Sequence, residues 1–383
     1  MKPHEIIQEL GTQRGRMRIV FFQWDLGRGG AETVTFYLSN YFCEKGNEVH
    51  ILTINSKDQL SERLNKEVKY TTFNKKRIFS SLIPLIRFIR TENIDCFIAN
   101  VWPITAVSAI ASFFCSGLRQ QLLLIEHSNL GAEFKHKSKL FRFFLGLSIF
   151  FLHNQAYKVI AVSNGVREDL IRRGLRREKT KVIYDPAYPT LAENKDNDEE
   201  GEKKWFKQDC LKLSSVGHLK KAKNYPNLIN AIDILKNEKK INCQLVIAGE
   251  GSEKNKIKAL INKKQLTNEI TLVGSISNSI SLIEASDLLV LSSSYEGFGM
   301  VIVEALSLGK TVVSTDCHSG PSEIIGDNEF GYLCKVDDPL DLAEKIDYAR
   351  KNIMNPEKLI NRSKEFTLEK IGPLYEEILD TLN

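Results

Sequence analysis

Short apolar runs alternate with helix-length amphipathic stretches along almost the whole chain of 383 residues, and this alternation constrains the fold more than any other feature. Six strand-like runs occupy the first half, at 17–22, 48–54, 95–99, 121–126, 158–162 and 181–184. Five more follow, at 211–217, 243–249, 269–274, 287–293 and 310–315. Strands that alternate with helices are typical of βαβ units and parallel sheets. The sequence therefore predicts an α/β protein.

An acidic segment at 190–204, TLAENKDNDEEGEKK, interrupts this alternation. Because it contains few apolar residues, it cannot build a core, and we interpret it as a linker. Chains of this length usually divide into domains of about 100–200 residues. We therefore expect one Rossmann-like domain at 1–189 and a second at 205–362. The last segment, 363–383, has apolar residues at helical spacing.

The composition favours a cytoplasmic protein. The N-terminus is polar and lacks the apolar core of a secretion signal. Seven cysteines are scattered without a CxxC pair, which favours reduced thiols over a disulfide framework. Residues 96–118 carry no formal charge, but polar residues and Pro103 interrupt them, so we expect a buried strand, a turn and a buried helix.

The charge is distributed unevenly between the two halves. Residues 1–189 contain 28 Lys and Arg against 17 Asp and Glu, a balance of +11, whereas the remainder has 25 against 31, a balance of −6. A basic half favours an anionic partner. The sequence has no motif of nucleic-acid binding, so we expect no nucleic acid and favour anionic lipid headgroups.

The basic and apolar stretch at 135–152, KHKSKLFRFFLGLSIFFL, allows two interpretations. It could form a core helix whose cations are simply solvated. Alternatively, it could lie in a membrane interface, with its cations toward anionic lipid and its aromatic side chains inward. The basic balance of the N-terminal half favours the second interpretation.

A glycine-rich loop, QWDLGRGGAE, follows the first strand-like run and opens a helix. Gly29 and Gly30 allow a ligand to approach the backbone, and the helix N-terminus attracts phosphate. As a dinucleotide fingerprint the loop fails, because the third glycine of GxGxxG would fall on Glu32. A glycine turn without a ligand remains the alternative.

A second loop, in SSSYEGFGMVIVEALSL at 292–308, combines glycines with two carboxylates. Glu296 precedes the turn Gly297-Phe298-Gly299, a helix begins near Met300, and Glu304 lies early in that helix. Such a helix start can bind a diphosphate, and the carboxylates can accept hydrogen bonds from sugar hydroxyls. The alternative is that Glu296 is only a charge at the helix cap and Glu304 only a solvated helix residue, since carboxylates are common near helix starts.

Taken together, these loops resemble glycosyltransferase family 4. The matching segments are GGAE at 29–32, VGHLKKAKN at 216–224, AGEG at 248–251 and SSSYEGFGMVIVEAL at 292–306. STDCHSGPSEI at 314–324 is similar to bacterial surface-polysaccharide and glycan-assembly members. The resemblance implies the GT-B fold, in which two Rossmann-like domains with parallel sheets face each other across a cleft. It further implies that the N-terminal domain binds the acceptor, the C-terminal domain binds the nucleotide sugar, and the last helix packs back on the N-terminal domain.

The resemblance also assigns roles to individual residues. Glu296 would bind donor-sugar hydroxyls, Glu304 the ribose, and Lys223 the departing diphosphate, while His127 would lie near the donor sugar. The expected catalytic residues are His127, Lys223 and Glu296. The expected donor-binding residues are Gly29, Gly30, His218, Lys223, Gly249, Glu296, Gly297, Phe298, Gly299, Met300 and Glu304.

One position departs from the family pattern. His218 stands where the family usually has arginine. Histidine lacks the bidentate guanidinium fork and carries at most one positive charge. Either Lys220, Lys221 and Lys223 share its task, or diphosphate binding is weaker.

We therefore expect a retaining transferase that moves a hexose or N-acetylhexosamine from a nucleotide sugar, with UDP implied by the family, to a glycan acceptor carried on a polyprenyl diphosphate. We expect it at the inner face of the cytoplasmic membrane as a peripheral protein. We expect no cofactor and no metal, since the DxD spacing at Asp196–Asp198 lies in the acidic linker. The alternatives are an NAD(P)-dependent oxidoreductase, a non-catalytic sugar-nucleotide-binding subunit, and an epimerase or phosphorylase of the same fold.

Overall fold

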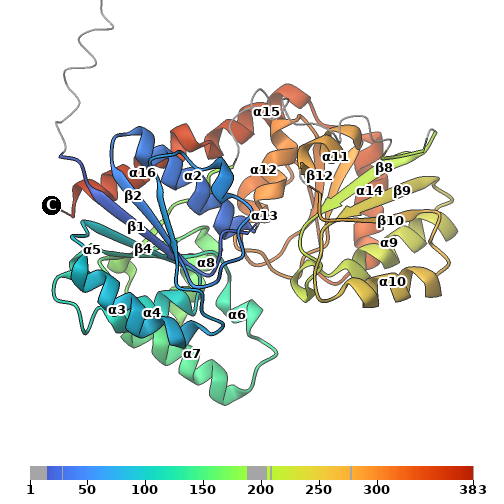
Figure 1. Ribbon diagram of the computed structural model, residues 1–383. Helices are drawn as coiled ribbons and strands as arrows, with labels where there is room; N and C mark the ends of the chain where they lie inside the picture. The colour runs from blue at the N-terminus through green and yellow to red at the C-terminus, as the bar shows by residue number, and fades with distance from the viewer. Residues whose placement is uncertain (1–14, 28, 188–204, 208, 277, 383) are drawn as a thin grey trace, which may run out of the picture.

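Two parallel β-sheets with helices on both faces form the two halves of the molecule (Figure 1). The computed structural model describes residues 15–27, 29–187, 205–207, 209–276 and 278–382. The N-terminal sheet has the strand order β3-β2-β1-β4-β5-β6-β7, and the C-terminal sheet has the order β10-β9-β8-β11-β12-β13. Both orders change direction beside the first strand of the sheet, at β1/β4 and β8/β11. Ligands bind at such points, outside the carboxyl ends of the strands.

The strands of the N-terminal sheet are β1 (Arg18–Gln23), β2 (Glu48–Thr53), β3 (Lys69–Thr72), β4 (Cys96–Asn100), β5 (Leu122–Glu126), β6 (Lys158–Ala161) and β7 (Thr180–Val182). Those of the C-terminal sheet are β8 (Leu211–Val216), β9 (Cys243–Ala248), β10 (Ile270–Gly274), β11 (Leu288–Leu291), β12 (Thr311–Thr315) and β13 (Tyr332–Cys334). The central strands are apolar on both faces because helices cover both faces of a parallel sheet.

The N-terminal domain carries the helices α2 (Gly30–Glu44), α3 (Leu82–Thr91), α4 (Ile104–Ala111), α5 (Leu118–Gln121), α6 (Leu130–Glu133), α7 (Lys139–Phe151) and α8 (Asn164–Arg172). The C-terminal domain carries α9 (Tyr225–Asn237), α10 (Lys254–Lys263), α11 (Ser279–Ala285), α12 (Met300–Ser307), α13 (Pro321–Ile325), α14 (Pro339–Lys351) and α15 (Pro356–Ser363). No helix among the residues described is long and apolar enough to cross a bilayer.

The predicted α/β class and all eleven predicted strands are confirmed, and two edge strands were missed. β3 has the sequence KYTT and is largely solvent-accessible, and β13 has only three residues. β3 lacks an apolar run, and the apolar run of β13, YLC, is too short to stand out in the sequence. The expected strand, turn and helix at 96–118 correspond to β4, the turn at Pro103 and α4.

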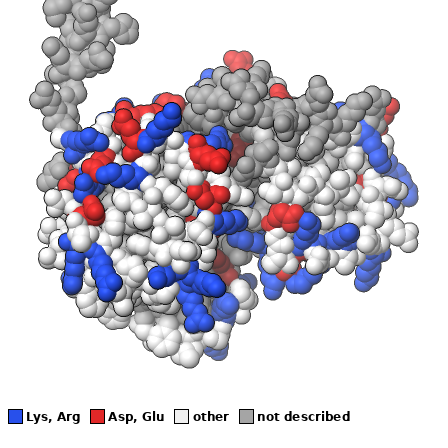
Figure 2. Space-filling view, viewed as in Figure 1, with Lys and Arg blue, Asp and Glu red and all other residues white. Residues whose placement is uncertain are grey.

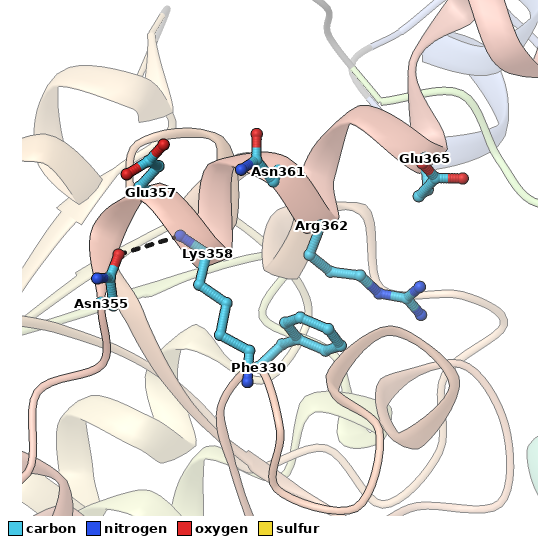
Figure 3. A pocket seen from close by; sticks show the side chains of 7 residues that line it. All are labelled: Phe330, Asn355, Glu357, Lys358, Asn361, Arg362 and Glu365. Carbon is cyan, nitrogen blue, oxygen red and sulfur yellow. Dashed lines mark hydrogen bonds between the residues drawn. The ribbon is translucent and has the colours of Figure 1, made fainter.

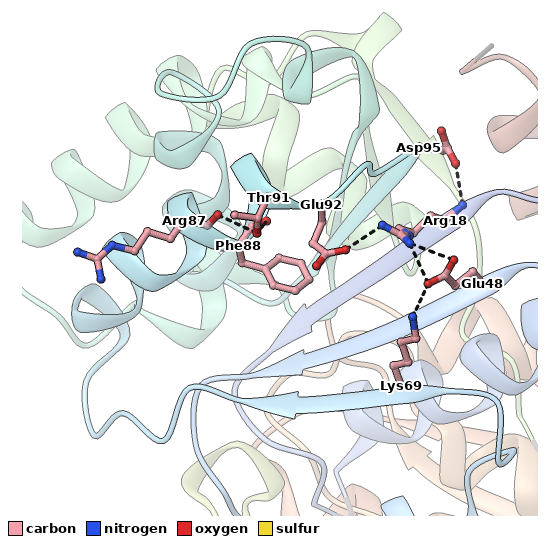
Figure 4. Close-up of polar contacts among 8 residues, drawn as sticks. All are labelled: Arg18, Glu48, Lys69, Arg87, Phe88, Thr91, Glu92 and Asp95. Carbon is pink, nitrogen blue, oxygen red and sulfur yellow. Dashed lines mark hydrogen bonds and ion pairs between the residues drawn. The ribbon is translucent and has the colours of Figure 1, made fainter.

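A charged network ties together the amino ends of the first strands, at the edge of the sheet away from the predicted site (Figure 4). Arg18 of β1 contacts Glu48 of β2 at 3.2 Å and Glu92, which follows α3, at 2.8 Å. Lys69 of β3 donates to Glu48 at 2.7 Å, and it lowers the pKa of this carboxyl together with Arg18. The network joins three strands and the end of α3, so we interpret it as structural.

The last helix, α16 (Leu368–Asp380), lies against α2 of the N-terminal domain (Figure 1). Gly372 lies so close to Tyr41 of α2 that a Cβ at this glycine would be 2.4 Å from the Tyr41 ring. Lys181 Nζ donates to Glu377 at 2.8 Å, and the N–H of Ala187 donates to Phe366 O at 2.8 Å. The end of the chain therefore returns to the N-terminal domain. The predicted linker at 190–204 lies outside the described residues.

Candidate active site

The loop between β11 and α12, residues 292–299, forms one wall of the candidate site and is named the donor loop here. Its backbone ends in Gly299, whose φ of 101° lies in the left-handed region that favours glycine. Ser319 Oγ donates to Glu296 O at 2.7 Å, and a Cβ at Gly320 would be 2.1 Å from Phe298 O. The segment around Gly320 therefore holds the donor loop from behind and directs the N-terminus of α12 toward the other domain.

An ion pair lies at the centre of the donor loop. Lys223 Nζ donates to Glu296 Oε1 at 2.5 Å, and Ser293 Oγ donates to the same oxygen at 2.6 Å. The Lys223 loop is itself fixed, because Ser292 Oγ donates to Lys223 O at 2.8 Å and Ser294 N donates to Ala222 O at 2.7 Å. The two predicted catalytic residues of this domain thus come together with little freedom.

Two further predicted donor-binding residues, Glu304 and His218, lie near this pair. Glu304 lies on α12, where burial raises the pKa of its carboxyl, and Ser279 Oγ contacts it at 3.4 Å. Partial desolvation of the His218 ring, together with the charges of Lys220, Lys223 and Lys57, lowers the pKa of His218. A neutral histidine adds no positive charge for a diphosphate, so the cations here come from lysines.

Gly249, a further predicted donor-binding residue, directly follows β9 and has a φ of 149°. Its N–H donates to Gly274 O at 2.7 Å, and a Cβ at this position would be 2.0 Å from Gly217 O. The packing of the β8 and β9 loops alone therefore requires glycine here, whether or not a ligand binds.

The opposite wall belongs to the N-terminal domain and contains His127, which directly follows β5. Its side chain is buried, and its Nδ1 lies 3.1 Å from Asp185 Oδ1, while its buried Nε2 has no hydrogen-bond partner in the structure. Burial alone would lower the pKa of His127, but the carboxylates of Asp185, Glu126 and Glu32 together raise it. A second polar group bound at Nε2 would complete the hydrogen bonding of this ring.

The glycine-rich loop brings a second carboxylate to the same wall. A Cβ at Gly29 would be 2.1 Å from Glu32 Oε2, so the Glu32 side chain folds back over the loop. Burial raises the pKa of Glu32, Asp25 adds to this rise, and His127 and Lys220 oppose it. A Cβ at Gly30 would lie 3.7 Å from Met300 Sδ at the start of α12. The glycine-rich loop therefore meets the N-terminus of α12 across the domain junction.

The two walls touch at Gly297. A Cβ at this position would be 1.9 Å from His127 O, and Ser163 Oγ donates to Gly297 O at 2.7 Å. The predicted residues from both domains, His127, Gly30, Glu296 and Met300, are thus brought to one place. Figure 2 shows that Lys, Arg, Asp and Glu side chains gather where the domains meet.

A second contact between the domains lies beside the first. Glu323 of α13 accepts hydrogen bonds from the N–H groups of Asn164 and Gly165, at 2.8 and 3.0 Å. These N–H groups begin α8, and the carboxylate satisfies donors that a helix start leaves free. Tyr184 donates to Glu323 at 3.2 Å and stacks on Phe298, with ring centres 5.3 Å apart.

The chemistry of this junction suits an anion. The α12 N-terminus and Lys223 provide N–H groups and positive charge, which bind and stabilise a diphosphate. Glu296, Glu304 and Glu32 are acceptors for hydroxyl groups. The residues described contain no cluster of three side chains that could bind a metal ion.

A separate pocket of 580 Å³ is lined by α15 and the loop that carries Phe330 (Figure 3). Phe330 lines it between Lys358 and Arg362, each 5.1 Å from the ring centre. None of the predicted site residues lines this cavity, so it is not the predicted donor site.

Three carboxylates at the junction escaped prediction: Glu32, Asp185 and Glu323. Glu32 breaks the dinucleotide fingerprint and belongs to the matching segment GGAE, but no role was assigned to it. Asp185 lies 58 residues from His127 and Glu323 lies 159 residues from Asn164, so no local spacing could reveal these pairs.

Two sequence families match the chain in succession. The profile described as Glycosyltransferase Family 4 matches residues 28–187, and the profile described as Glycosyl transferases group 1 matches residues 196–366. The chain belongs to glycosyltransferase family 4. It is therefore a glycosyltransferase, which removes the oxidoreductase alternative.

Two similar proteins of this family come from Campylobacter jejuni. One is named GalNAc-alpha-(1->4)-GalNAc-alpha-(1->3)-diNAcBac-PP-undecaprenol alpha-1,4-N-acetyl-D-galactosaminyltransferase; it is 27% identical, with 91% of this chain and 93% of the relative covered. The other is named N-acetylgalactosamine-N,N'-diacetylbacillosaminyl-diphospho-undecaprenol 4-alpha-N-acetylgalactosaminyltransferase; it is 27% identical, with 93% of this chain and 97% of the relative covered.

Solved structures confirm the predicted GT-B fold of this glycosyltransferase. Anabaena HepE in complex with UDP and glucose has a TM-score of 0.75 at 21% identity, covering 96% of this chain and 100% of HepE. Sucrose-phosphate synthase from Thermosynechococcus elongatus has a TM-score of 0.79 at 18% identity, covering 96% and 99%. At these identities the likeness concerns the fold alone.

Proposed function

We propose that this glycosyltransferase moves a hexose or N-acetylhexosamine from a UDP-sugar to a lipid-linked glycan, with retention of the anomeric configuration and without a metal. The Lys223–Glu296 pair carries the proposal, because it lies at the N-terminus of α12 and opposite His127. The names of the Campylobacter relatives, which contain undecaprenol-linked acceptors, support the acceptor class. The UDP complex of HepE supports the donor class.

In the proposed reaction, the bond between the sugar C1 and the diphosphate oxygen breaks, and its electron pair stays on the diphosphate. Lys223 and the N–H groups at the α12 N-terminus stabilise the negative charge that develops there. An acceptor hydroxyl forms the new bond on the same face of the sugar, and its proton passes to the departing diphosphate. Glu296 and His127 would orient the donor sugar during this step.

The proposal places the protein at the inner face of the cytoplasmic membrane as a peripheral protein. A polyprenyl-diphosphate acceptor remains in the bilayer, so the enzyme has to reach the headgroup region. The basic balance of the N-terminal half supports this location.

Binding of nucleotide sugars tests the donor site. A donor that binds only the folded state raises stability, by about 2.7 kcal/mol at one hundred times its Kd. We expect one UDP-sugar to raise the melting temperature of the wild type, and Glu304→Ala to reduce this shift strongly. Glu284→Ala, an exposed carboxylate of neighbouring α11, is the matched control and should keep the full shift.

A protein that binds no sugar nucleotide would contradict the donor proposal. Binding without transfer to any acceptor would favour the non-catalytic subunit, and turnover of the donor without an acceptor would favour the epimerase or phosphorylase. The anomeric configuration of the product, measured by NMR, tests retention. A trapped covalent sugar–enzyme adduct would overturn the same-face step.

A further inference from the structure

The exposed large apolar side chains are concentrated on one face of the N-terminal domain. Among the described residues, twelve such side chains are exposed, and only Leu340, Tyr348 and Ile353 belong to the C-terminal domain. The other nine are each between 51% and 71% exposed and are named the phenylalanine face here: Phe79, Ile83, Phe113, Phe114, Leu140, Phe143, Phe144, Phe150 and Phe151. A cluster of this size on a water-soluble domain indicates a binding surface.

The helix α7 supplies most of this face and is apolar on two sides. Its inner side buries Leu145 and Ile149. Its outer side presents Leu140, Phe143, Phe144, Phe150 and Phe151, which follow the spacing i, i+3, i+4, i+10 and i+11 and so form one stripe. A helix that is apolar all round is normally buried, so the outer stripe of α7 requires a partner.

Two neighbouring segments extend the same face. Phe79 lies in the turn just before α3, Ile83 lies in the first turn of α3, and Phe113 and Phe114 follow α4. Arg90 of α3 donates to Phe114 O at 2.9 Å, which joins these two segments. In Figure 1, α3, α4 and α7 lie side by side below the N-terminal sheet.

Only positive charges accompany the phenylalanine face. The segments 75–91, 113–119 and 135–151 contain ten Lys and Arg and no Asp or Glu. Lys139 and Arg142 lie in the first turn of α7, where the helix dipole disfavours cations, so these charges do not serve helix stability. Figure 2 agrees, since the lower part of the N-terminal domain is white and blue with almost no red.

The charge pattern identifies the partner. A second copy of this chain would bring like charges together across a symmetric contact, which disfavours association. Protein interfaces are also depleted in Lys. By contrast, aromatic side chains beside Lys and Arg are the pattern of a surface that lies in the interface of an anionic membrane.

We propose that the phenylalanine face inserts into the headgroup region of an anionic bilayer, with Lys135, Lys137, Lys139 and Arg142 on the lipid phosphates. The biological reason for this membrane contact rests on the proposed lipid-linked acceptor, whereas the experiment that tests the contact needs no acceptor. It adds α3 and the end of α4 to the stretch at 135–152 that the sequence singled out.

The phenylalanine face lies close to the candidate site, both along the chain and through side-chain contacts. Only α6 separates His127 from α7 along the chain. Trp102 packs against Phe134 and Phe141, with ring centres 5.2 and 5.9 Å apart, and donates to Ser148 of α7 at 3.2 Å. Because α7 is held rigidly beside the junction, docking of its outer stripe would place the reaction centre next to the headgroup of a lipid-linked acceptor.

Co-sedimentation with vesicles tests the proposal without donor or acceptor. We expect the full-length protein to bind vesicles of phosphatidylcholine and phosphatidylglycerol in equal amounts on the order of tenfold more tightly than phosphatidylcholine alone, and added salt to weaken the binding. Replacement of Phe143, Phe144, Phe150 and Phe151 by Ser should weaken binding on the order of tenfold or more. Replacement of Lys135, Lys137, Lys139 and Arg142 by Gln should cost roughly fivefold for each cation.

The matched control replaces the three exposed apolar side chains of the C-terminal domain, Leu340, Tyr348 and Ile353, by Ser and should bind vesicles as the wild type does. Equal binding by the phenylalanine variant and the wild type would overturn the proposal. So would a phenylalanine variant that turns a dimer into a monomer in sedimentation velocity without a change in vesicle binding. The donor-induced thermal shift should persist in all variants, so a failure of vesicle binding alone overturns the membrane contact and leaves the proposed transfer reaction intact.

Discussion

Charged residues at the domain junction are held in place by partners on neighbouring loops. His127 lies between Asp185, Glu126 and Glu32, which raise its pKa against the effect of burial. Lys223 lies on Glu296, so the cation proposed for the diphosphate is already oriented. Of the two pairs, the sequence motifs indicated Lys223 and Glu296, but they identified His127 without its partner.

The His127–Asp185 pair predicts a pH-dependent stability. A histidine whose pKa is higher in the folded protein than in the unfolded chain stabilises the fold below its ordinary pKa and loses this contribution as the pH rises through the raised value. Asp185→Asn should therefore lower the free energy of unfolding by about 1.5–3 kcal/mol at roughly pH 6, and by clearly less at roughly pH 9. Urea unfolding of both proteins at the two pH values checks this. An equal loss of unfolding free energy at both pH values would show that the positive charge of His127 does not contribute to stability.

At the scale of elements, the sequence predicted individual strands better than it predicted which helices pack against each other. Central strands are apolar runs that can be read locally, whereas the two described strands that were missed, β3 and β13, lie at sheet edges. The contact of α16 with α2 depends on Gly372 and Tyr41, which lie more than three hundred residues apart in the chain. Such a pairing leaves no local pattern, so the family resemblance alone suggested it.

Two glycines in helices should respond oppositely to alanine. Gly372 of α16 faces the Tyr41 ring, so Gly372→Ala should overpack the contact with α2 and cost about 1–3 kcal/mol. Gly146 lies within α7 with open space around it, so Gly146→Ala should stabilise the protein by roughly 0.5–1 kcal/mol through helix propensity. Thermal unfolding of both variants checks the pair. A stabilising effect of Gly372→Ala would mean that α16 does not pack on α2 in solution.

For the whole molecule, function depends on how the two domains meet. The carboxylate of Glu323 accepts hydrogen bonds from the first N–H groups of α8 in the other domain, and Gly297 lies against His127. The sequence identified the loops on each side, but it could not show which residues of one domain would face those of the other. That information lies in the relative placement of two separately folded sheets.

Removal of the Glu323 carboxylate should weaken this placement. Glu323→Ala leaves two N–H groups of α8 without their partner, and hydrogen bonds to a charged group contribute about 1.5–3 kcal/mol. We expect the KM for the donor to rise by about tenfold or more, because both domains complete the donor site, while kcat changes less. Steady-state kinetics checks this, with Glu329→Ala, a carboxylate on the loop after α13, as control. A fall in kcat at unchanged KM would contradict this role.

The backbone hydrogen bond from Ala187 to Phe366 has a consequence for how the two domains can move relative to each other. Ala187, the last described residue of the N-terminal domain before the second sheet, pairs with the segment Phe366–Thr367 where the chain returns to this domain, so these two ends lie at one point. Any opening of the enzyme is then a rotation about that point, and atoms move in proportion to their distance from it. Phe298 stacks on Tyr184 and packs edge-on against Phe366, so it lies near the pivot and would keep its neighbours, whereas β10 at the far edge would travel furthest.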